Sequence, residues 1–166
     1  MENVVARVAV TLLTILGIAF VSTLGYALFS DYKIQSVSSD INTVITNARG
    51  AFSQGANGYT NFTNANVTAM NTDGVFPPDM VRPGGVTDAW GNPVTLGSAS
   101  GSTQGSIQFG GGGSETDREC SGVATTLKDY VSLQIGGTTF TQNNVPDPVA
   151  AGTACAGSPE ITVVFQ

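Results

Sequence analysis

The sequence predicts an α+β fold in which one long N-terminal helix packs on a small antiparallel β-sheet. Residues 1–51 contain no proline, and their apolar residues pass from a continuous run to a helical spacing, which predicts the helix. Short β-type runs separated by glycine-rich turns fill the later half and predict the sheet. A chain of 166 residues ordinarily forms one compact domain. A helix of about 50 residues, roughly 75 Å long, is longer than such a domain covers.

The first part of the helix, residues 1–30, is apolar on all sides. Residues 8–30 form 23 consecutive positions without a charge. At about 1.5 Å per residue they span roughly 35 Å, enough to cross a bilayer. The run is too long for a cleavable secretory signal, and the few flanking charges give little indication of orientation. We expect lipid or other copies of the chain to bury it.

Residues 31–53 are predicted to continue the helix with one apolar face. Its apolar residues recur at spacings of three, four and seven, and they are Ile34, Val37, Ile41, Val44, Ile45, Ala48 and Phe52. Polar residues lie between them. We expect this stripe to form one wall of the core of a globular head, residues 54–166.

The head is predicted to contain five strands, one short helix and a long loop. The strands are residues 93–96, 106–109, 131–135, 138–141 and 161–165. Gly136-Gly137 predicts a hairpin between the third and fourth strands. Early acidic residues and a late lysine indicate a helix within residues 115–130. The Asn- and Thr-rich stretch after Ser53 is predicted to leave the helix as a loop.

Composition excludes several classes of function. The net charge is −6, and residues 36–166 hold 10 acidic and 4 basic residues, so direct binding to nucleic acid is not expected. The absence of histidine removes imidazole-based catalysis and most transition-metal sites. With no nucleophile beside a plausible base, we expect no enzyme and no cofactor.

Two polar motifs are candidate ligand sites. The four glycines 110–113 invite a phosphate-loop interpretation, but the Lys-Ser/Thr that should follow is missing and acidic residues come next. A flexible connector is the preferred interpretation. Asp73 with Asp79 or Asp88 offers oxygen ligands for calcium, yet their spacing fits no calcium-loop motif. A solvated acidic face is therefore expected.

Cys120 and Cys155 are the only cysteines. An even pair in a Gly-, Ser- and Thr-rich exported domain predicts a disulfide, which implies an oxidising compartment. On the chain-entropy model, closing a loop of this length stabilises the fold by roughly 4 kcal/mol. The alternative is two unrelated buried thiols.

Glu2 and Arg7 precede the apolar run. Such charges usually mark a membrane interface. If the helix packs among copies of itself, the Glu2 carboxylate needs a cation, which either Arg7 or the N-terminal ammonium of Met1 in a neighbouring copy can supply. Glu2 would then fix the register between copies.

These features together resemble a mature type IV pilin. They are a short polar start with an early acidic residue, an apolar run, an amphipathic continuation and a disulfide-closed, strand-rich head. The segment Asp88-Ala89-Trp90-Gly91-Asn92-Pro93-Val94 is similar to the Trp-Gly element with which many pilins and pseudopilins enter their first strand. The start at Met1 and the loop between the cysteines resemble the type IVb branch, especially the thin-pilus major pilins of conjugative plasmids.

The resemblance implies that prepilin peptidase cuts a short leader before Met1 and methylates the new amine. Two positions depart from the family. The acidic residue that is commonly fifth in the mature chain is replaced by Val5, and Glu2 lies three residues earlier. The mid-helix proline is also missing, so Gly17 and Gly25 are the candidates for loosening the helix.

The implied function is that of a major pilin in an extracellular type IV pilus of a Gram-negative bacterium, serving cell contact, adhesion or conjugation. The subunit would wait in the inner membrane, and the pilus assembly machinery would then bring copies together. The expected filament core consists of Leu12, Leu13, Leu16, Phe20, Leu24 and Leu28. Alternatives are a minor pilin, a type II secretion pseudopilin, or a membrane-anchored binding module that does not polymerise.

Overall fold

The computed structural model describes the backbone of residues 2–157 and 160–166. Side chains are described for residues 10–15, 28–157 and 160–166. The chain forms two compact units, Met1–Tyr32 and Lys33–Gln166, and the second is called the globular unit below. The predicted long helix is confirmed as α1 (Glu2–Phe52).

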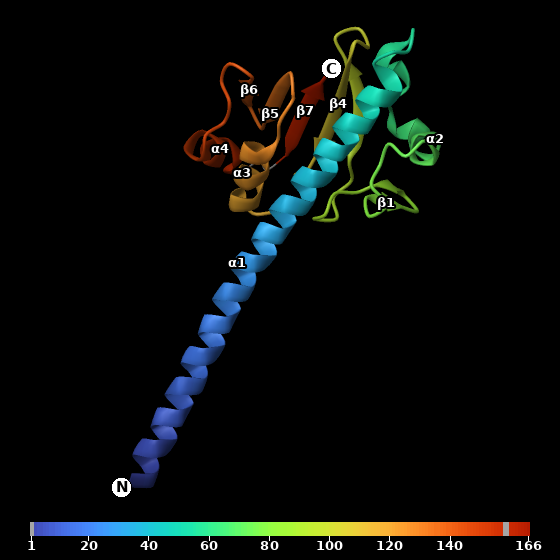
Figure 1. Ribbon diagram of the computed structural model, residues 1–166. Coiled ribbons are helices and arrows are strands. Elements are labelled where there is room, and N and C mark those ends of the chain that lie inside the picture. The colour runs from blue at the N-terminus through green and yellow to red at the C-terminus, as the bar shows by residue number, and fades with distance from the viewer. Residues whose placement is uncertain (1, 158–159) are drawn as a thin grey trace. The chain divides into compact units, whose positions relative to one another are not determined.

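The remaining elements all lie in the globular unit (Figure 1). The helices are the 3₁₀ turns η1 (Gly58–Asn61) and η2 (Asn64–Asn66), α2 (Val67–Thr72), α3 (Asp117–Thr126) and α4 (Pro148–Cys155). The strands are β1 (Val81–Arg82), β2 (Gly85–Val86), β3 (Thr95–Ala99), β4 (Gln104–Phe109), β5 (Ser132–Ile135), β6 (Thr138–Thr141) and β7 (Ile161–Phe165). β1 and β2 form a small separate hairpin.

The main sheet has five antiparallel strands in the order β3-β4-β7-β5-β6. β7 lies at its centre, where Val163 faces Ile107 of β4 on one side and Leu133 of β5 on the other. These three side chains are fully buried. Alternate residues of β4 and β7 point into the core, as expected for a sheet with one covered face.

The later half of α1 supplies the helical wall of this core. The stripe predicted from its spacing is buried at five positions, and Ile34 and Phe52 at its two ends are partly buried against the same core. The five are Val37, Ile41, Val44, Ile45 and Ala48. In Figure 1, α3 and α4 lie on one side of this part of α1, and α2 lies with the β1–β2 hairpin on the other.

An aromatic cluster closes the core where α1 ends. Phe52, Tyr59, Phe62 and Phe165 stack or meet edge to face, with ring centroids between 5.4 and 6.1 Å apart. Gly105 of β4 leaves the space that these rings occupy. A Cβ atom built on it would lie 2.6 Å from Cζ of Phe165 and 2.9 Å from Cδ1 of Tyr59.

Polar side chains of α1 fasten distant loops to the helix. The Arg49 guanidinium donates to the carbonyl of Gln166 at 2.6 Å and to the carbonyl of Asp129. Asn47 donates through Nδ2 to the carbonyl of Gly74 at 3.0 Å. The helix therefore holds both the end of β7 and the loop that follows α2.

Some predicted boundaries were wrong. The strand expected at residues 93–96 begins at Thr95, because Pro93 has no N–H for the ladder and makes only an isolated bridge with Thr87. The short helix expected within residues 115–130 is confirmed as α3, which ends at Thr126, where Leu127 leaves helical geometry and turns into the core. The predicted hairpin at Gly136-Gly137 is confirmed, because Ile135 pairs with Thr138.

The stretch after Ser53 is less loop-like than predicted. It contains η1, η2 and α2, and Val67 and Met70 of α2 point into the core one helical turn apart. α4 and the β1–β2 hairpin were not predicted. α4 has a recognisable start, because Asp147 caps the amides of Val149 and Ala150 at 2.8 Å and a proline takes the first helical position.

We predict that Gly105→Ala destabilises the globular unit by about 1–3 kcal/mol, because the added methyl group meets packed rings. The measurement is urea unfolding of the full chain in detergent, followed by the fluorescence of Trp90, the single tryptophan. Gly152→Ala is the matched control, because nothing lies within 4 Å of its added Cβ in helix α4. Equal stability of the Gly105 variant and the wild type would contradict this packing.

Candidate functional site

The described apolar side chains of the unit Met1–Tyr32 are exposed. Leu13 is 69% exposed, and Leu28 and Phe29 are each 71% exposed. Val10, Leu12 and Ile15 are exposed as well. The Thr14 hydroxyl donates to the carbonyls of Val10 at 2.7 Å and Thr11 at 3.0 Å, so its polar group is satisfied within the helix. The helix thus presents an apolar surface that requires a partner.

Several predicted site residues fall outside the residues with described side chains. They are Met1, Glu2, Arg7, Leu16, Gly17, Phe20, Leu24 and Gly25. Leu12, Leu13 and Leu28 of the predicted filament core are described, and all three are exposed. Within the described part of the chain, no helix has the length and apolar character needed to cross a membrane.

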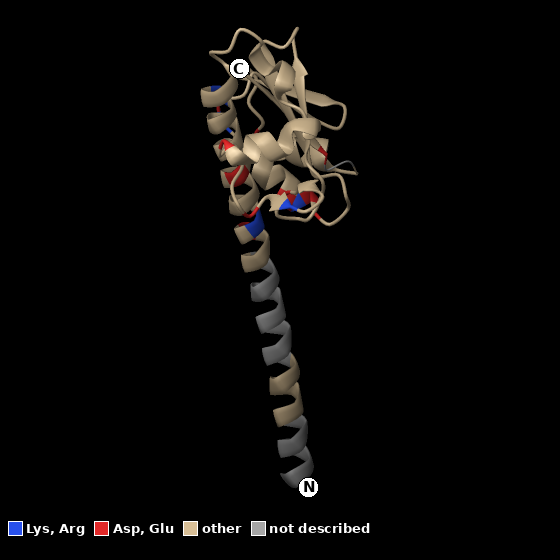
Figure 2. Cartoon of the chain, turned by 90° about the vertical axis from the view of Figure 1, so that its right-hand side faces the viewer, with Lys and Arg blue, Asp and Glu red and all other residues tan. Residues whose placement is uncertain are grey.

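The globular unit differs in that it buries nearly all of its large apolar side chains. Among its described residues, the exposed large hydrophobics are Val131, Val145 and Val149. Three long segments of it, residues 51–72, 89–114 and 130–146, also contain neither acidic nor basic residues (Figure 2). The apolar surface of α1 is therefore the most unusual feature of the described chain.

The Trp-Gly element forms a tight turn around the buried Asp88 carboxylate. Its Oδ1 atom accepts from the amides of Trp90 at 3.0 Å and Asn92 at 2.8 Å. Gly91 has φ +91°, which a glycine adopts readily. The Trp90 ring is buried in the core. The element therefore directs the chain into β3 and anchors that turn with an aromatic side chain.

The same carboxylate reaches the glycine-rich loop at residues 110–113. Asp88 Oδ2 accepts from the amide of Gly110 at 3.0 Å, and the Glu115 carboxylate accepts from the amide of Gly111. Asn92 Nδ2 donates to Glu115 Oε2 at 2.8 Å and links the two acids. The predicted flexible connector is thus a hydrogen-bonded turn. Carboxylates of the protein occupy two amides that a phosphate would need.

Burial and hydrogen bonds act on the pKa of these two acids in opposite directions. Burial raises the pKa of Asp88, although hydrogen bonds from the amides of Asn92, Gly110 and Trp90 oppose the rise. Burial also acts to raise the pKa of Glu115, but hydrogen bonds from Asn92, Gly111 and Ser114 outweigh it and lower the pKa. The network is therefore structural, with its charge held by amides.

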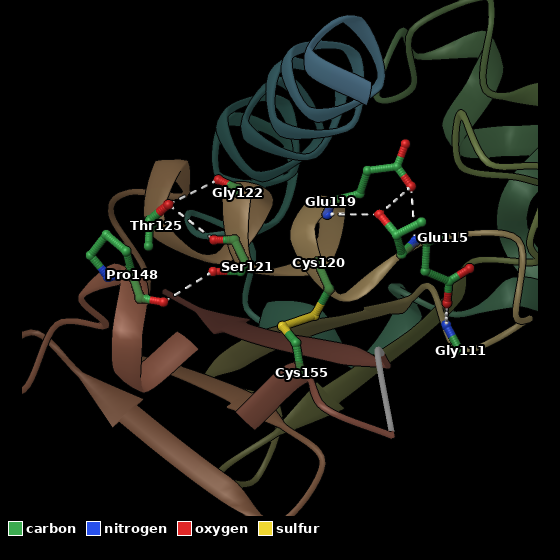
Figure 3. Close-up of a disulfide and its surroundings, with 10 residues drawn as sticks. Gly111, Glu115, Glu119, Cys120, Ser121, Gly122, Thr125, Pro148 and Cys155 are labelled. Atoms are coloured by element: carbon green, nitrogen blue, oxygen red, sulfur yellow. Dashed lines mark hydrogen bonds between the residues drawn. A yellow bond between two sulfur atoms is a disulfide. The ribbon is translucent and has the colours of Figure 1, made fainter. Parts of the chain in front are cut away.

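Cys120 of α3 and Cys155 of α4 are joined by a disulfide, with Cα atoms 5.9 Å apart (Figure 3). Next to it, Thr116 and Glu119 form a capping box. The Glu119 amide donates to Thr116 Oγ1 at 3.2 Å, and Glu119 Oε2 accepts from the Thr116 amide at 2.8 Å. The spacing Thr-x-x-Glu in the sequence indicates this start of α3, which the sequence analysis missed.

In the described part of the chain, no three His, Cys, Asp or Glu side chains are grouped so that they could hold a metal ion. Asp73 and Asp79 are exposed, whereas Asp88 is buried and bonded to amides. Asp73 and Asp79 are therefore solvated as expected, whereas Asp88 is not part of a solvated acidic face.

Asp40 is the most perturbed acid on the later half of α1. Partial burial raises its pKa from the ordinary value of 3.8 to about 6, and the nearby Asp79 carboxylate adds to the rise. A hydrogen bond at 3.4 Å from the Ser36 hydroxyl opposes it. Asp40 and Asp79 repel each other when both are charged. This repulsion opposes the packing of the loop before β1 against α1.

The long helix α1 packed on a five-stranded antiparallel sheet is a pilin fold. A solved structure with this fold is the crystal structure of type IV b pilin from Salmonella typhi. It matches with a TM-score of 0.61 and 16% sequence identity, and the match covers 79% of this chain and 97% of that chain.

The PilS N terminal family model matches residues 31–166, so the chain belongs to the PilS family. No curated protein sequence matches it. Membership of this family makes the chain a pilus subunit.

We predict that Asp40→Asn makes the chain more stable at neutral pH. A raised pKa in the folded state means that the folded chain binds the Asp40 proton more tightly, so stability is lost as pH rises from about 4 to about 6. At pH 7.5 the variant should gain about 1 kcal/mol in the free energy of unfolding, a figure reduced for solvent screening. Urea unfolding at pH 4 and pH 7.5 measures the difference.

Asp79→Asn is the control for the like charge. It removes the repulsion but leaves the burial of Asp40 in place, so it should give only part of the gain. A gain of the same size at both pH values would contradict this account of Asp40.

Proposed function

We propose that the chain is a major pilin that polymerises through α1 into an extracellular type IV pilus. The exposed apolar surface of residues 10–15 and 28–29 is the observation that supports polymerisation most strongly. Leaving one such side chain in water rather than burying it costs roughly 1.5–3 kcal/mol, so the six exposed ones need cover from lipid or from other copies. The filament is proposed to serve cell contact, adhesion or conjugation.

Copies that meet head to tail through two different surfaces form an open helix rather than a closed ring. An apolar helix packed among copies of itself, with the globular units outside, is such an arrangement. Leu12, Leu13 and Leu28 would lie in the filament core with Leu16, Phe20 and Leu24. Gly17 and Gly25 would give this part of the helix freedom to loosen.

Before assembly, residues 8–30 are proposed to lie in the inner membrane. Extraction then replaces lipid with neighbouring helices, so packing and polar pairing rather than the hydrophobic effect distinguish the two states. A separate assembly machine would supply the energy of extraction, after prepilin peptidase has exposed the N-terminal amine of Met1. Glu2 would pair with that amine in a neighbour or with Arg7, and would fix the register.

The uncharged loops of the globular unit suit the outer surface of such a filament. Residues 51–72 and 89–114 are rich in Asn, Ser, Thr and Gly and carry no charge. Hydrogen bonds to the Asp88 and Glu115 carboxylates hold both ends of the second segment, residues 89–114, in place. A surface of this kind is proposed to meet other cells.

We predict that Leu13→Ser reduces the yield of surface filaments at least tenfold, because it removes apolar packing worth more than about 1.4 kcal/mol. Glu2→Lys should reduce the yield further by placing a cation beside the neighbouring amine. The measurement is negative-stain electron microscopy of sheared filaments, with Thr139→Ser as the control on an exposed position of β6.

Filaments of wild-type yield from both variants would contradict the proposed assembly. A wild-type chain that stays monomeric in detergent and forms no filament in cells would instead favour a membrane-anchored binding module. Filaments in which the chain is a rare component would favour a minor pilin.

A further inference from the structure

A pocket of about 400 Å³ opens in the globular unit between the end of α3 and the loop after β6. It is lined by Leu127, Lys128, Asp129, Tyr130, Gln142 and Val145. Leu127 and Tyr130 are buried and supply apolar walls, whereas Val145 is 61% exposed. Lys128 is exposed and adds one cation. Asp129 is exposed as well, so the pocket combines an apolar interior with one cation and one anion.

Hydrogen bonds hold this pocket in shape. Gln142 Nε2 donates to the carbonyl of Tyr130 at 3.1 Å, and the Arg49 guanidinium donates to the carbonyl of Asp129. The disulfide ties α3, which leads into the pocket, to α4. A pocket formed in advance loses little conformational entropy when a partner enters.

The unit Met1–Tyr32 carries two exposed aromatic side chains that could enter such a pocket. Phe29 and Tyr32 are 71% and 70% exposed. They are three residues apart on α1, so their side chains share one helix face. Aromatic side chains that enter preformed pockets are the usual anchors of protein interfaces.

The ammonium group of Lys128 also suits an aromatic partner. The globular unit is acidic overall, so a second copy approaches it most favourably where it presents a cation. An aromatic ring attracts an ammonium group through its electron-rich face, and burial strengthens the attraction. Lys128 beside an apolar pocket therefore favours an aromatic partner.

We propose that Phe29 and Tyr32 of one copy occupy the pocket of Leu127, Tyr130 and Val145 in another copy, with Lys128 against the Tyr32 ring. This inference rests on the proposed function, because it names the contact that joins neighbouring subunits of the filament. The contact joins two different surfaces, so each copy uses its aromatic pair on one neighbour and its pocket on another.

The test places a photoreactive amino acid, p-benzoylphenylalanine, at position 32 of the full chain. This variant is produced together with the wild-type chain, so that wild-type subunits support assembly. Sheared filaments are irradiated, and the cross-linked dimers are digested and mapped by mass spectrometry. We expect dimers in which position 32 is joined to residues 127–145 of a second copy. The same probe at Thr139 is the matched control and should give no dimer joined to that segment.

Substitutions in the pocket give a second measurement. Here the co-produced chain without the photoreactive residue carries Lys128→Glu or Val145→Asp. Each substitution should lower the yield of the position-32 dimer at least fivefold. Arg82→Glu, a charge reversal at an exposed position outside the pocket, should leave the yield unchanged.

The outcomes separate this inference from the proposed function. Filaments that form normally but give dimers mapped only to α1, or elsewhere on the globular unit, would overturn the inference alone. Cross-links to a different protein would also overturn it. Absence of filaments from the wild-type chain would overturn both.

Discussion

The structure depends on a difference in burial along helix α1, whose apolar side chains are buried in its later half and exposed at the described positions of its first half. The later half of α1 gives Val37, Ile41 and Ile45 to the core of the globular unit, whereas Leu13, Leu28 and Phe29 remain exposed to solvent. The same backbone therefore serves two kinds of packing, one within the chain and one that needs another molecule. The buried half fixes how the sheet assembles on the helix. The described apolar side chains of the first half find no cover within the chain.

The globular unit is glycine-rich, and a few specific connections supplement its hydrophobic core. The disulfide joins α3 to α4, and Arg49 binds two carbonyls that lie 80 and 117 residues away along the chain. The Asp88 and Glu115 carboxylates occupy the amides of the glycine-rich loop. Long uncharged loops can therefore face outwards without loosening the sheet that supports them.

Periodicity predicted the features that depend on local spacing. The apolar stripe of α1 and the strands β6 and β7 were predicted with the residues that the structure gives them. The start of β3 was misplaced because Pro93 cannot join the ladder, and the start of α3 was missed although Thr116 and Glu119 have the spacing of a capping box.

The link between Asn92 and Glu115 joins residues 23 positions apart, so no local pattern predicts it. The pocket beside Lys128 depends on tertiary contacts in the same way. For Glu2 and Arg7 the assembly role remains a prediction from the sequence.

A cryo-electron microscopy reconstruction of filaments sheared from the cell surface would test the central claim most directly, namely that copies of the chain bury the exposed surface of α1. The account predicts that Leu12, Leu13, Ile15 and Leu28 pack against α1 helices of neighbouring copies in the filament core, with the globular units on the outside. A filament in which these side chains face solvent, or in which the globular units alone hold the copies together, would contradict it.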